Sequence, residues 1–141
     1  MTQSWLDEVN SQVEKHFQFL PRDFEYEPKT PERTSHARHA FLKRYRYEKS
    51  EVRIVLFDWD TPERHWTVYF CKDIDSTYPI KPGVDPSIFT IANRLAIDIP
   101  IYPSDAITSN QYTLDDILRE LSCFTRTHAT EVLKGDFSLF Q

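Results

Sequence analysis

The first 20 residues carry apolar side chains at the spacing of an amphipathic helix. Ser4 stands where a helix cap is favoured, with Asp7 three residues later. Pro21 is expected to end the helix, and the further prolines up to residue 35 predict an irregular surface connection. The apolar positions that share one helical face are Trp5, Leu6, Val9, Val13, Phe17 and Leu20.

From about Ala37 the pattern changes to short runs that are rich in β-branched and aromatic residues, as is typical of strands. The middle run has apolar residues on both faces, which suits a central strand. Thr61–Arg64 predicts a type I turn, because Pro62 fixes the dihedral angle required at its second position. The predicted strands are Ala40–Glu48, Val52–Asp58 and His65–Lys72.

Residues 73–86 predict a loop, which ends in Asp85–Pro86, a pair that resembles a helix cap followed by a first-turn proline. A short helix follows, with Ile88, Ile91, Ala92 and Leu95 as its apolar positions. Residues 96–102 alternate apolar side chains with Asp98 and Pro100, so an edge strand is an open alternative for this segment.

The last helix has the clearest pattern in the chain. Thr113 caps it with Asp116 three residues later, and Gly135 is placed to end it. Phe137 and Phe140 are expected to fold back onto the core. The predicted apolar face consists of Leu114, Ile117, Leu118, Leu121, Phe124, His128 and Val132.

This order of elements predicts an α+β fold. We expect an antiparallel β-meander of three or four strands, with an N-terminal helix and C-terminal helices packed on one face. No composition shift divides the chain, so we expect residues 1–141 to form a single domain.

The chain of 141 residues has only two glycines, Gly83 and Gly135. A Walker loop, a dinucleotide fingerprint and a nucleophile elbow each need two or more glycines at fixed spacing. None of these motifs is present, and we expect no cofactor.

The two cysteines and the lengths of the apolar runs indicate the expected cellular location of the protein. Cys71 and Cys123 form no Cys-x-x-Cys pair, and we expect both to be buried and inert in a reducing compartment. No run approaches the roughly 18 apolar residues of a membrane span, and the N-terminus has no secretory pattern. The expected location is cytoplasmic, with no membrane partner.

The net charge of −5 conceals a basic strip from Arg33 to Arg53, which alone carries +5 and leaves −10 for the remainder. Arg44 and Arg46 project from one face of the predicted strand and Phe41, Tyr45 and Tyr47 from the other. Basic and aromatic residues together suggest phosphate contacts and base stacking, but an isoelectric point near 5.5 disfavours nucleic acid. The alternative is a solvated face whose arginines pair with Glu48, Glu51 or other acids. The strip contains Arg33, Arg38, Lys43, Arg44, Arg46, Lys49 and Arg53.

The turn after the second predicted strand concentrates acidic side chains. Asp58, Asp60, Glu63 and His65 lie within eight residues, a density that suits a divalent metal or general acid–base chemistry. Turns are commonly polar, however, and no partner group follows on the next strand. We therefore assign no metal site and no catalytic residue here.

Trp59 lies between Asp58 and Asp60, where full burial of its ring is difficult. Exposed aromatic rings beside charges are typical of interface hot spots. The alternative is a ring that covers Phe57. The candidate binding residues are Trp59, Asp58, Asp60, Arg38, Arg44 and Arg46.

These observations favour a small protein-binding domain that acts by surface complementarity. They favour a protein that is not an enzyme over an enzyme. Its acidic, aromatic-rich profile resembles that of small antitoxin-like immunity proteins, whose acidic surfaces suit the neutralisation of basic nucleases through electrostatic steering. We therefore expect an immunity or antitoxin-like protein or an adaptor. One alternative is a small enzyme or ligand-binding domain in which the Asp58/Asp60/His65 hairpin or the arginine face lines a pocket between sheet and helices. Another is a nucleic-acid-binding module that uses the strip from Arg33 to Arg53. We expect a protein partner, and a monomer or homodimer.

Overall fold

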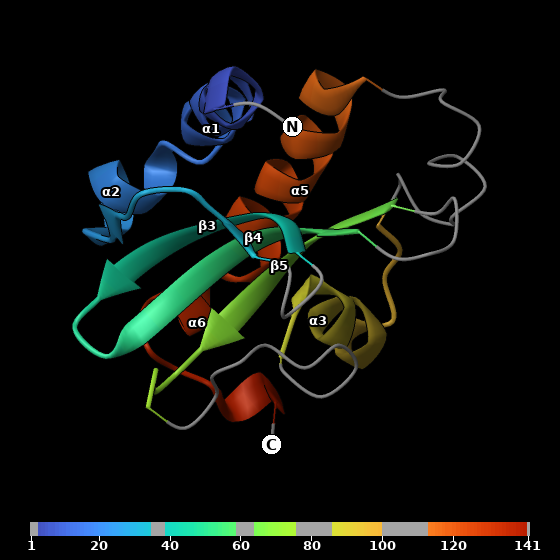
Figure 1. Ribbon diagram of the computed structural model, residues 1–141. Coiled ribbons are helices and arrows are strands. Elements are labelled where there is room, and N and C mark those ends of the chain that lie inside the picture. Colours follow the sequence, from blue (N-terminus) through green and yellow to red (C-terminus); the bar gives the residue numbers. More distant parts are fainter. Residues whose placement is uncertain (1–2, 35–38, 59–63, 76–85, 100–112, 141) are drawn as a thin grey trace.

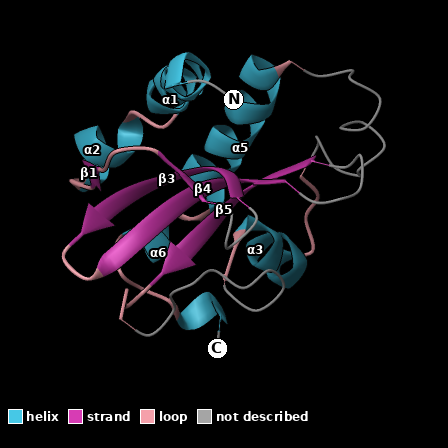
Figure 2. Cartoon of the chain, viewed as in Figure 1, coloured by secondary structure: helices cyan, strands magenta, loops and turns pink. Residues whose placement is uncertain are grey.

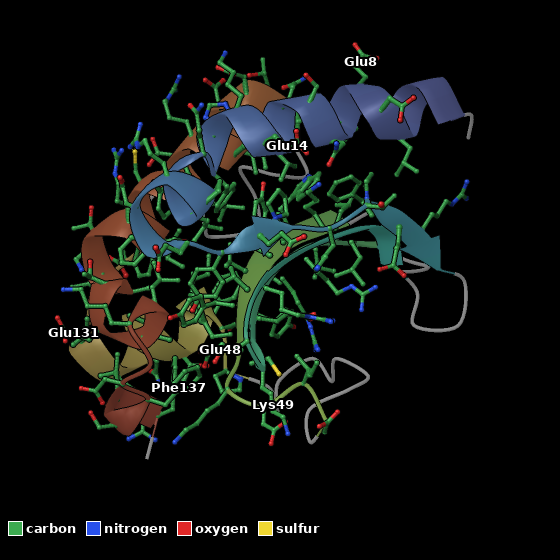
Figure 3. All side chains as sticks on the ribbon, turned by 90° about the vertical axis from the view of Figure 1, so that its left-hand side faces the viewer. Glu8, Glu14, Glu48, Lys49, Glu131 and Phe137 are labelled. Carbon is green, nitrogen blue, oxygen red and sulfur yellow. The ribbon has the colours of Figure 1, made fainter. Side chains whose placement is uncertain are left out.

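The computed structural model describes residues 3–34, 39–58, 64–75, 86–99 and 113–140 (Figure 1). An antiparallel sheet forms one layer, and the helices gather on one of its faces (Figures 1 and 2). The view turned by 90° shows the helices on one side of the curved sheet (Figure 3). The predicted α+β fold, with an antiparallel meander and helices at both ends of the chain, is confirmed.

The meander consists of β3 (His39–Tyr47), β4 (Ser50–Asp58) and β5 (Arg64–Cys71), with β4 in the centre. Tyr47 pairs with Ser50, so a two-residue turn joins β3 to β4. Glu48 in this turn has φ 54°, in the left-handed region that tight hairpin turns use. This turn sets the register of the hairpin from the Tyr47–Ser50 pair to the Phe41–Leu56 pair, beyond which an irregularity between His39 and Phe41 shifts it.

The outer edge of β3 is covered by a segment that we predicted to be irregular. Within it, β1 (Glu27–Pro28) pairs with the end of β3, and β2 (Glu32–Thr34) pairs with its beginning. Between them, the Lys29 amide donates to the Arg44 carbonyl at 2.8 Å. The correction is that this proline-rich segment follows the sheet edge, where a missing proline N–H is tolerated.

The main core lies between the sheet and the helices. Alternate residues of the central strands point toward the helices, as the two-residue period predicts. On β4 and β5 these residues are Val52, Ile54, Leu56, Trp66, Val68 and Phe70, all buried. The fully buried Leu118 and Leu121 of the last long helix belong to the same core.

The first helix, α1 (Gln3–His16), packs against α5 (Leu114–His128). His16 Nε2 lies 2.8 Å from Asp115 Oδ1 and joins the two helices. This hydrogen bond lowers the pKa of Asp115 below its ordinary value, and nearby Lys15 and Arg119 act in the same direction. Ser4, the predicted cap, lies inside α1.

We predicted that the N-terminal helix ends at Pro21, and this prediction is wrong. Instead α1 ends at His16, and a short second helix, α2 (Phe19–Phe24), contains Pro21 in its first turn. A proline is tolerated there because first-turn amides have no intrahelical acceptor. Glu25, with φ 63°, closes α2 in the left-handed conformation.

The helix α3 (Ile88–Leu95) begins two residues later than predicted, with Ser87 as its cap. The Ser87 side chain accepts from the Phe89 amide, while Thr90 Oγ1 accepts from the Ser87 amide, so a capping box replaces the expected Asp85–Pro86 cap. The edge strand that we left open is absent from residues 96–99, and residues 100–102 lie outside the described part.

The C-terminal helical region begins as predicted, because Thr113 and Asp116 form a capping box at the start of α5. It is interrupted after His128, which is exposed, and continues as α6 (Thr130–Leu133). Gly135 follows with φ 102°, and η1 (Ser138–Phe140) brings Phe140 to 6.2 Å from the Phe70 ring centroid. The predicted return of the C-terminus to the core is therefore confirmed.

The two cysteines differ in environment. Cys71 on β5 is buried, as predicted, but Cys123 is exposed. The prediction is wrong for Cys123 because this residue lies on α5 between the buried positions Ser122 and Phe124, on the side turned away from the core.

Two buried tyrosines predict a loss of stability at alkaline pH. Burial raises the pKa of Tyr26 to about 12 and that of Tyr45 further still. Above pH of about 10 the unfolded phenols ionise while the folded ones stay protonated, so the free energy of unfolding falls as pH rises, by about 2 kcal/mol for Tyr26 by pH 12. Urea unfolding across this pH range measures the loss.

The matched variants are Tyr45→Phe and Tyr26→Phe. Tyr45 Oη has no hydrogen-bond partner among the described residues, so Tyr45→Phe should leave stability at neutral pH unchanged or higher and flatten the alkaline decline. Tyr26 Oη donates to the Leu133 carbonyl at 2.9 Å, so Tyr26→Phe should cost about 1 kcal/mol at neutral pH. An alkaline decline unchanged in both variants would contradict the assignment.

Candidate functional site

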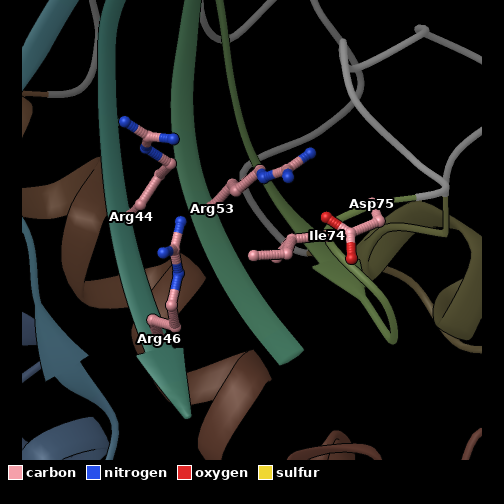
Figure 4. A pocket seen from close by; sticks show the side chains of 5 residues that line it. All are labelled: Arg44, Arg46, Arg53, Ile74 and Asp75. Carbon is pink, nitrogen blue, oxygen red and sulfur yellow. The ribbon is translucent and has the colours of Figure 1, made fainter. Parts of the chain in front are cut away.

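The face of the sheet opposite the helices carries three arginines. Arg44 and Arg46 lie on β3, and Arg53 lies beside them on β4 (Figure 4). A small apolar cluster of Leu42, Val55 and Tyr69 occupies the same face. This face therefore divides into an apolar part and an arginine-rich part.

The hairpin register brings the arginines together. Arg44 pairs with Arg53, and Arg46 pairs with Glu51. Like charges directly opposite each other in a sheet are destabilising, so the Arg44–Arg53 pair needs nearby negative charge. Two carboxylates of the chain supply part of it.

Glu51 lies completely buried between two of the arginines. Its Oε1 accepts from Arg53 Nε at 2.7 Å, and its Oε2 accepts from Arg46 Nε at 2.8 Å and Nη2 at 2.5 Å. Each carboxylate oxygen therefore serves a different arginine. Charge-assisted hydrogen bonds of this kind hold both guanidinium groups in place.

Arg44 has a different partner, Glu32 on β2, which accepts from Arg44 Nη2. The Nε atom of Arg44 is buried and has no acceptor among the described residues. The side chains of Arg44 and Arg46 remain 25% and 33% exposed, whereas Arg53 is 3% exposed. Arg44 and Arg46 are thus the accessible arginines of the cluster.

The three arginines line a pocket of about 380 Å³, together with Ile74 and Asp75 (Figure 4). The Ile74 amide donates to the Lys49 carbonyl at 2.9 Å, which ties this wall to the turn between β3 and β4. Asp75 lies 3.6 Å from Lys49 Nζ and is largely exposed, so it forms an outer rim. We call this site the arginine pocket.

Arg44 and Arg46 keep donors that their carboxylate partners do not use. Arg44 contacts Glu32 through Nη2, and Arg46 contacts Glu51 through Nε and Nη2. Each of these two side chains is partly exposed and carries further N–H groups. Guanidinium groups present planar pairs of N–H donors that suit carboxylate and phosphate oxygens, so the arrangement is suited to holding an oxyanion.

The structure separates the candidate binding residues that the sequence suggested. Arg44 and Arg46 lie together in the arginine pocket, whereas Arg38, Trp59 and Asp60 lie outside the described residues. Asp58 ends β4 opposite Arg64, but its side chain also lies outside the described part, as do Glu63 and the side chain of His65. Within the described ranges, no three His, Cys, Asp or Glu side chains are grouped as a metal site would require.

Two further expectations need correction. The arginine face does line a pocket, but on the sheet face opposite the helices and not between sheet and helices. The basic strip is also not one surface, because Lys43 points into the helix side, where it is 2% exposed and contacts Glu14 at 3.0 Å. Strand alternation places neighbouring basic residues on opposite faces.

Arg53 and Glu51 are missing from our list of candidate binding residues, although Arg53 belongs to the basic strip and Glu51 was named as a partner for its arginines, a pairing that the structure contains. They alternate with Val52 and Ile54 on β4, so a two-residue period places both on the polar face. A two-residue turn at Glu48 and Lys49 would also have set Arg46 opposite Glu51. The signal was present in the sequence, but it depended on knowing the turn length.

Comparisons with protein families, with curated proteins and with solved structures found nothing that matches this chain. In the described part of the chain, no helix has the length and apolar character needed to cross a membrane.

Proposed function

We propose that this chain is a binding protein that recognises an oxyanion, carried by a partner protein or by a small molecule, in the arginine pocket. The observation that supports this most is that Arg44 and Arg46, both partly exposed, line a pocket in which Glu51 already orients the Arg46 guanidinium group. Oriented donors lose little freedom when a ligand binds, which favours affinity.

The distribution of charge over the chain favours a single compact anionic group as the ligand over a nucleic-acid backbone. The whole chain carries a net charge of −5, so a long polyanion would be repelled by most of its surface. A single carboxylate or phosphate meets the local positive charge of Arg44 and Arg46 without covering the acidic remainder. An acidic side chain on a partner protein and a free anion share this chemistry.

Anion-dependent stabilisation tests the proposal. Inorganic phosphate should raise the melting temperature more than chloride at equal ionic strength, because a ligand that binds only the folded state stabilises it by about 2.7 kcal/mol at a concentration 100 times its Kd. Acetate and a glutamate-rich peptide form the other arms. A peptide that binds much more tightly than either free anion identifies a protein partner as the source of the oxyanion.

Two substitutions test whether phosphate binds in the arginine pocket. Arg46→Gln should weaken phosphate binding at least about tenfold, because it removes one of the two accessible guanidinium groups while Arg53 still pairs with Glu51. Arg119→Gln, on the far side of the fold in α5, is the matched control and should bind as the unchanged chain does. Equal phosphate binding by both variants, or stabilisation that follows ionic strength alone, would refute the proposal.

A further inference from the structure

A second pocket lies on the helix side of β3, against α1. Its walls come from Asn10 and Glu14 on α1, Lys43 on β3, and residues 28–31, and its volume is about 290 Å³. Glu14 lies on α1 above the sheet (Figure 3). This pocket, which we call the lysine pocket, shares no lining residue with the arginine pocket.

Lys43 is the buried cation of this pocket. Its side chain is 2% exposed, and among the described residues its one hydrogen-bond partner is Glu14 Oε1 at 3.0 Å. An ammonium group has three N–H donors, so two of them lack an acceptor in the described part. Buried donors without acceptors are costly, and a ligand that offers an acceptor would relieve that cost.

Asn10 supplies the complementary group. Its Nδ2 donates to Glu14 Oε1 at 3.3 Å, while its buried Oδ1 has no donor among the described residues. The opposite orientation of the amide would place Oδ1 beside a carboxylate, so the hydrogen-bond network supports this one. The lysine pocket thus has unfilled donors on Lys43 and an unfilled acceptor on Asn10.

The charges of the lysine pocket favour a neutral occupant. The Lys43 and Glu14 charges cancel, and Lys29 Nζ lies 3.5 Å from Glu27 Oε1. An anion would meet Glu14, and a cation would meet Lys43. The occupant that fits is neutral and carries both a hydrogen-bond acceptor and a hydrogen-bond donor.

Size and wall chemistry narrow the class further. One water occupies roughly 30 Å³ of liquid, so a pocket of about 290 Å³ has room for a small organic molecule. Pro28 and Pro31 provide rigid apolar walls beside the polar groups. A carboxamide combines a carbonyl oxygen and an N–H group at this scale.

We propose that the lysine pocket binds a small neutral molecule with a carboxamide group, whose oxygen accepts from Lys43 Nζ and whose N–H donates to Asn10 Oδ1. The site is independent of the arginine pocket in its residues, in its position and in the charge of its ligand.

Protein-observed NMR with acetamide as the probe tests this assignment. Acetamide should give saturable shifts of the Asn10 side-chain amide and of the Lys29 and Thr30 backbone amides. Acetate and methylammonium, which have similar size but carry a charge, should bind at least about tenfold more weakly. Peaks around Arg44 and Arg46 should not move, which separates this result from the outcome at the arginine pocket.

Two variants locate the binding. Lys43→Met keeps the length of the side chain and removes the donor, and Asn10→Ala removes the acceptor, so each should weaken acetamide binding at least about tenfold. Lys72→Met, at an exposed lysine after β5, is the control and should bind normally. If Lys43→Met does not fold, Asn10→Ala decides the question alone.

Three results would overturn the proposal. They are shifts that fail to saturate up to molar acetamide, acetate binding as strong as that of acetamide, and undiminished binding by folded Asn10→Ala protein. The first would mean that the lysine pocket holds water only.

Discussion

Glu51→Gln is expected to lower the free energy of unfolding by about 3–5 kcal/mol, because it removes the carboxylate that two arginines share. Arg53 is 3% exposed and lies opposite Arg44, so without Glu51 its charge stays buried beside another cation. Equilibrium unfolding in urea measures the change. The arginine pocket should be the most sensitive polar region of the described fold.

An exposed pair provides the control for this experiment. Asp23 accepts from Arg22 at 3.1 Å, but both side chains are about half exposed, so Asp23→Asn should have no measurable effect on unfolding. Equal effects of Glu51→Gln and Asp23→Asn would show that burial of the pair contributes nothing.

The same variant connects stability with the proposed function. In Glu51→Gln protein the arginines have lost their internal anion, so phosphate should restore part of the lost stability by pairing with them. Chloride at equal ionic strength should restore less. Failure of phosphate to restore stability would count against an oxyanion in the arginine pocket.

Phe70→Ala is expected to cost about 3–5 kcal/mol, through lost burial and the cavity left behind. Phe70 is 2% exposed on the helix face of β5, and its ring stacks on Phe140 at 6.2 Å between centroids. Without the Phe70 ring, the C-terminal turn η1 should therefore open more often, and faster hydrogen exchange of its amides would report this.

Phe89→Ala is the matched control, because the same side chain is removed from an exposed position on α3. Phe89 is 38% exposed, so its loss should cost less than about 1 kcal/mol. If Phe70→Ala is as mild as this control, the C-terminal segment does not depend on Phe70 for its packing.

The parts of the fold that were predictable from the sequence depend on local signals. The capping box of Thr113 and Asp116 and the alternation of Val52, Ile54 and Leu56 are each readable within a few residues. The predictions that failed concern features that depend on breaks or contacts elsewhere in the chain. Pro21 was taken as a helix end because its place in a first turn became visible only with the break after His16.

The candidate site was predictable in its residue types and not in its geometry. Arg44 and Arg46 share a face by alternation, but the pairing of Arg46 with Glu51 depends on the cross-strand register. The lysine pocket depends on Lys43 meeting a helix 29 positions earlier in the chain, at Glu14. Contacts over such distances follow from packing, which local patterns do not encode.

The two pockets lie on opposite sides of β3, and the ligands that we propose for them differ in charge. Arg44 faces one pocket and Lys43, its neighbour in the chain, faces the other. The segment along the outer edge of β3 takes part in both sites. Its Glu32 pairs with Arg44 at the arginine pocket, and its residues 28–31 line the lysine pocket. A ligand in the lysine pocket would contact this edge segment directly, and a ligand in the arginine pocket would be connected to it through the Arg44–Glu32 pair.

The edge segment also affects how copies of the chain meet. Residues 27–34 occupy the hydrogen-bonding positions along the outer side of β3, so another molecule cannot extend the sheet there without displacing them. Pro28 and Pro31 have no amide hydrogen to offer to an incoming strand. An edge that carries two prolines is a poor template for intermolecular β-pairing, and this side of the molecule is thereby protected against fibrillar aggregation.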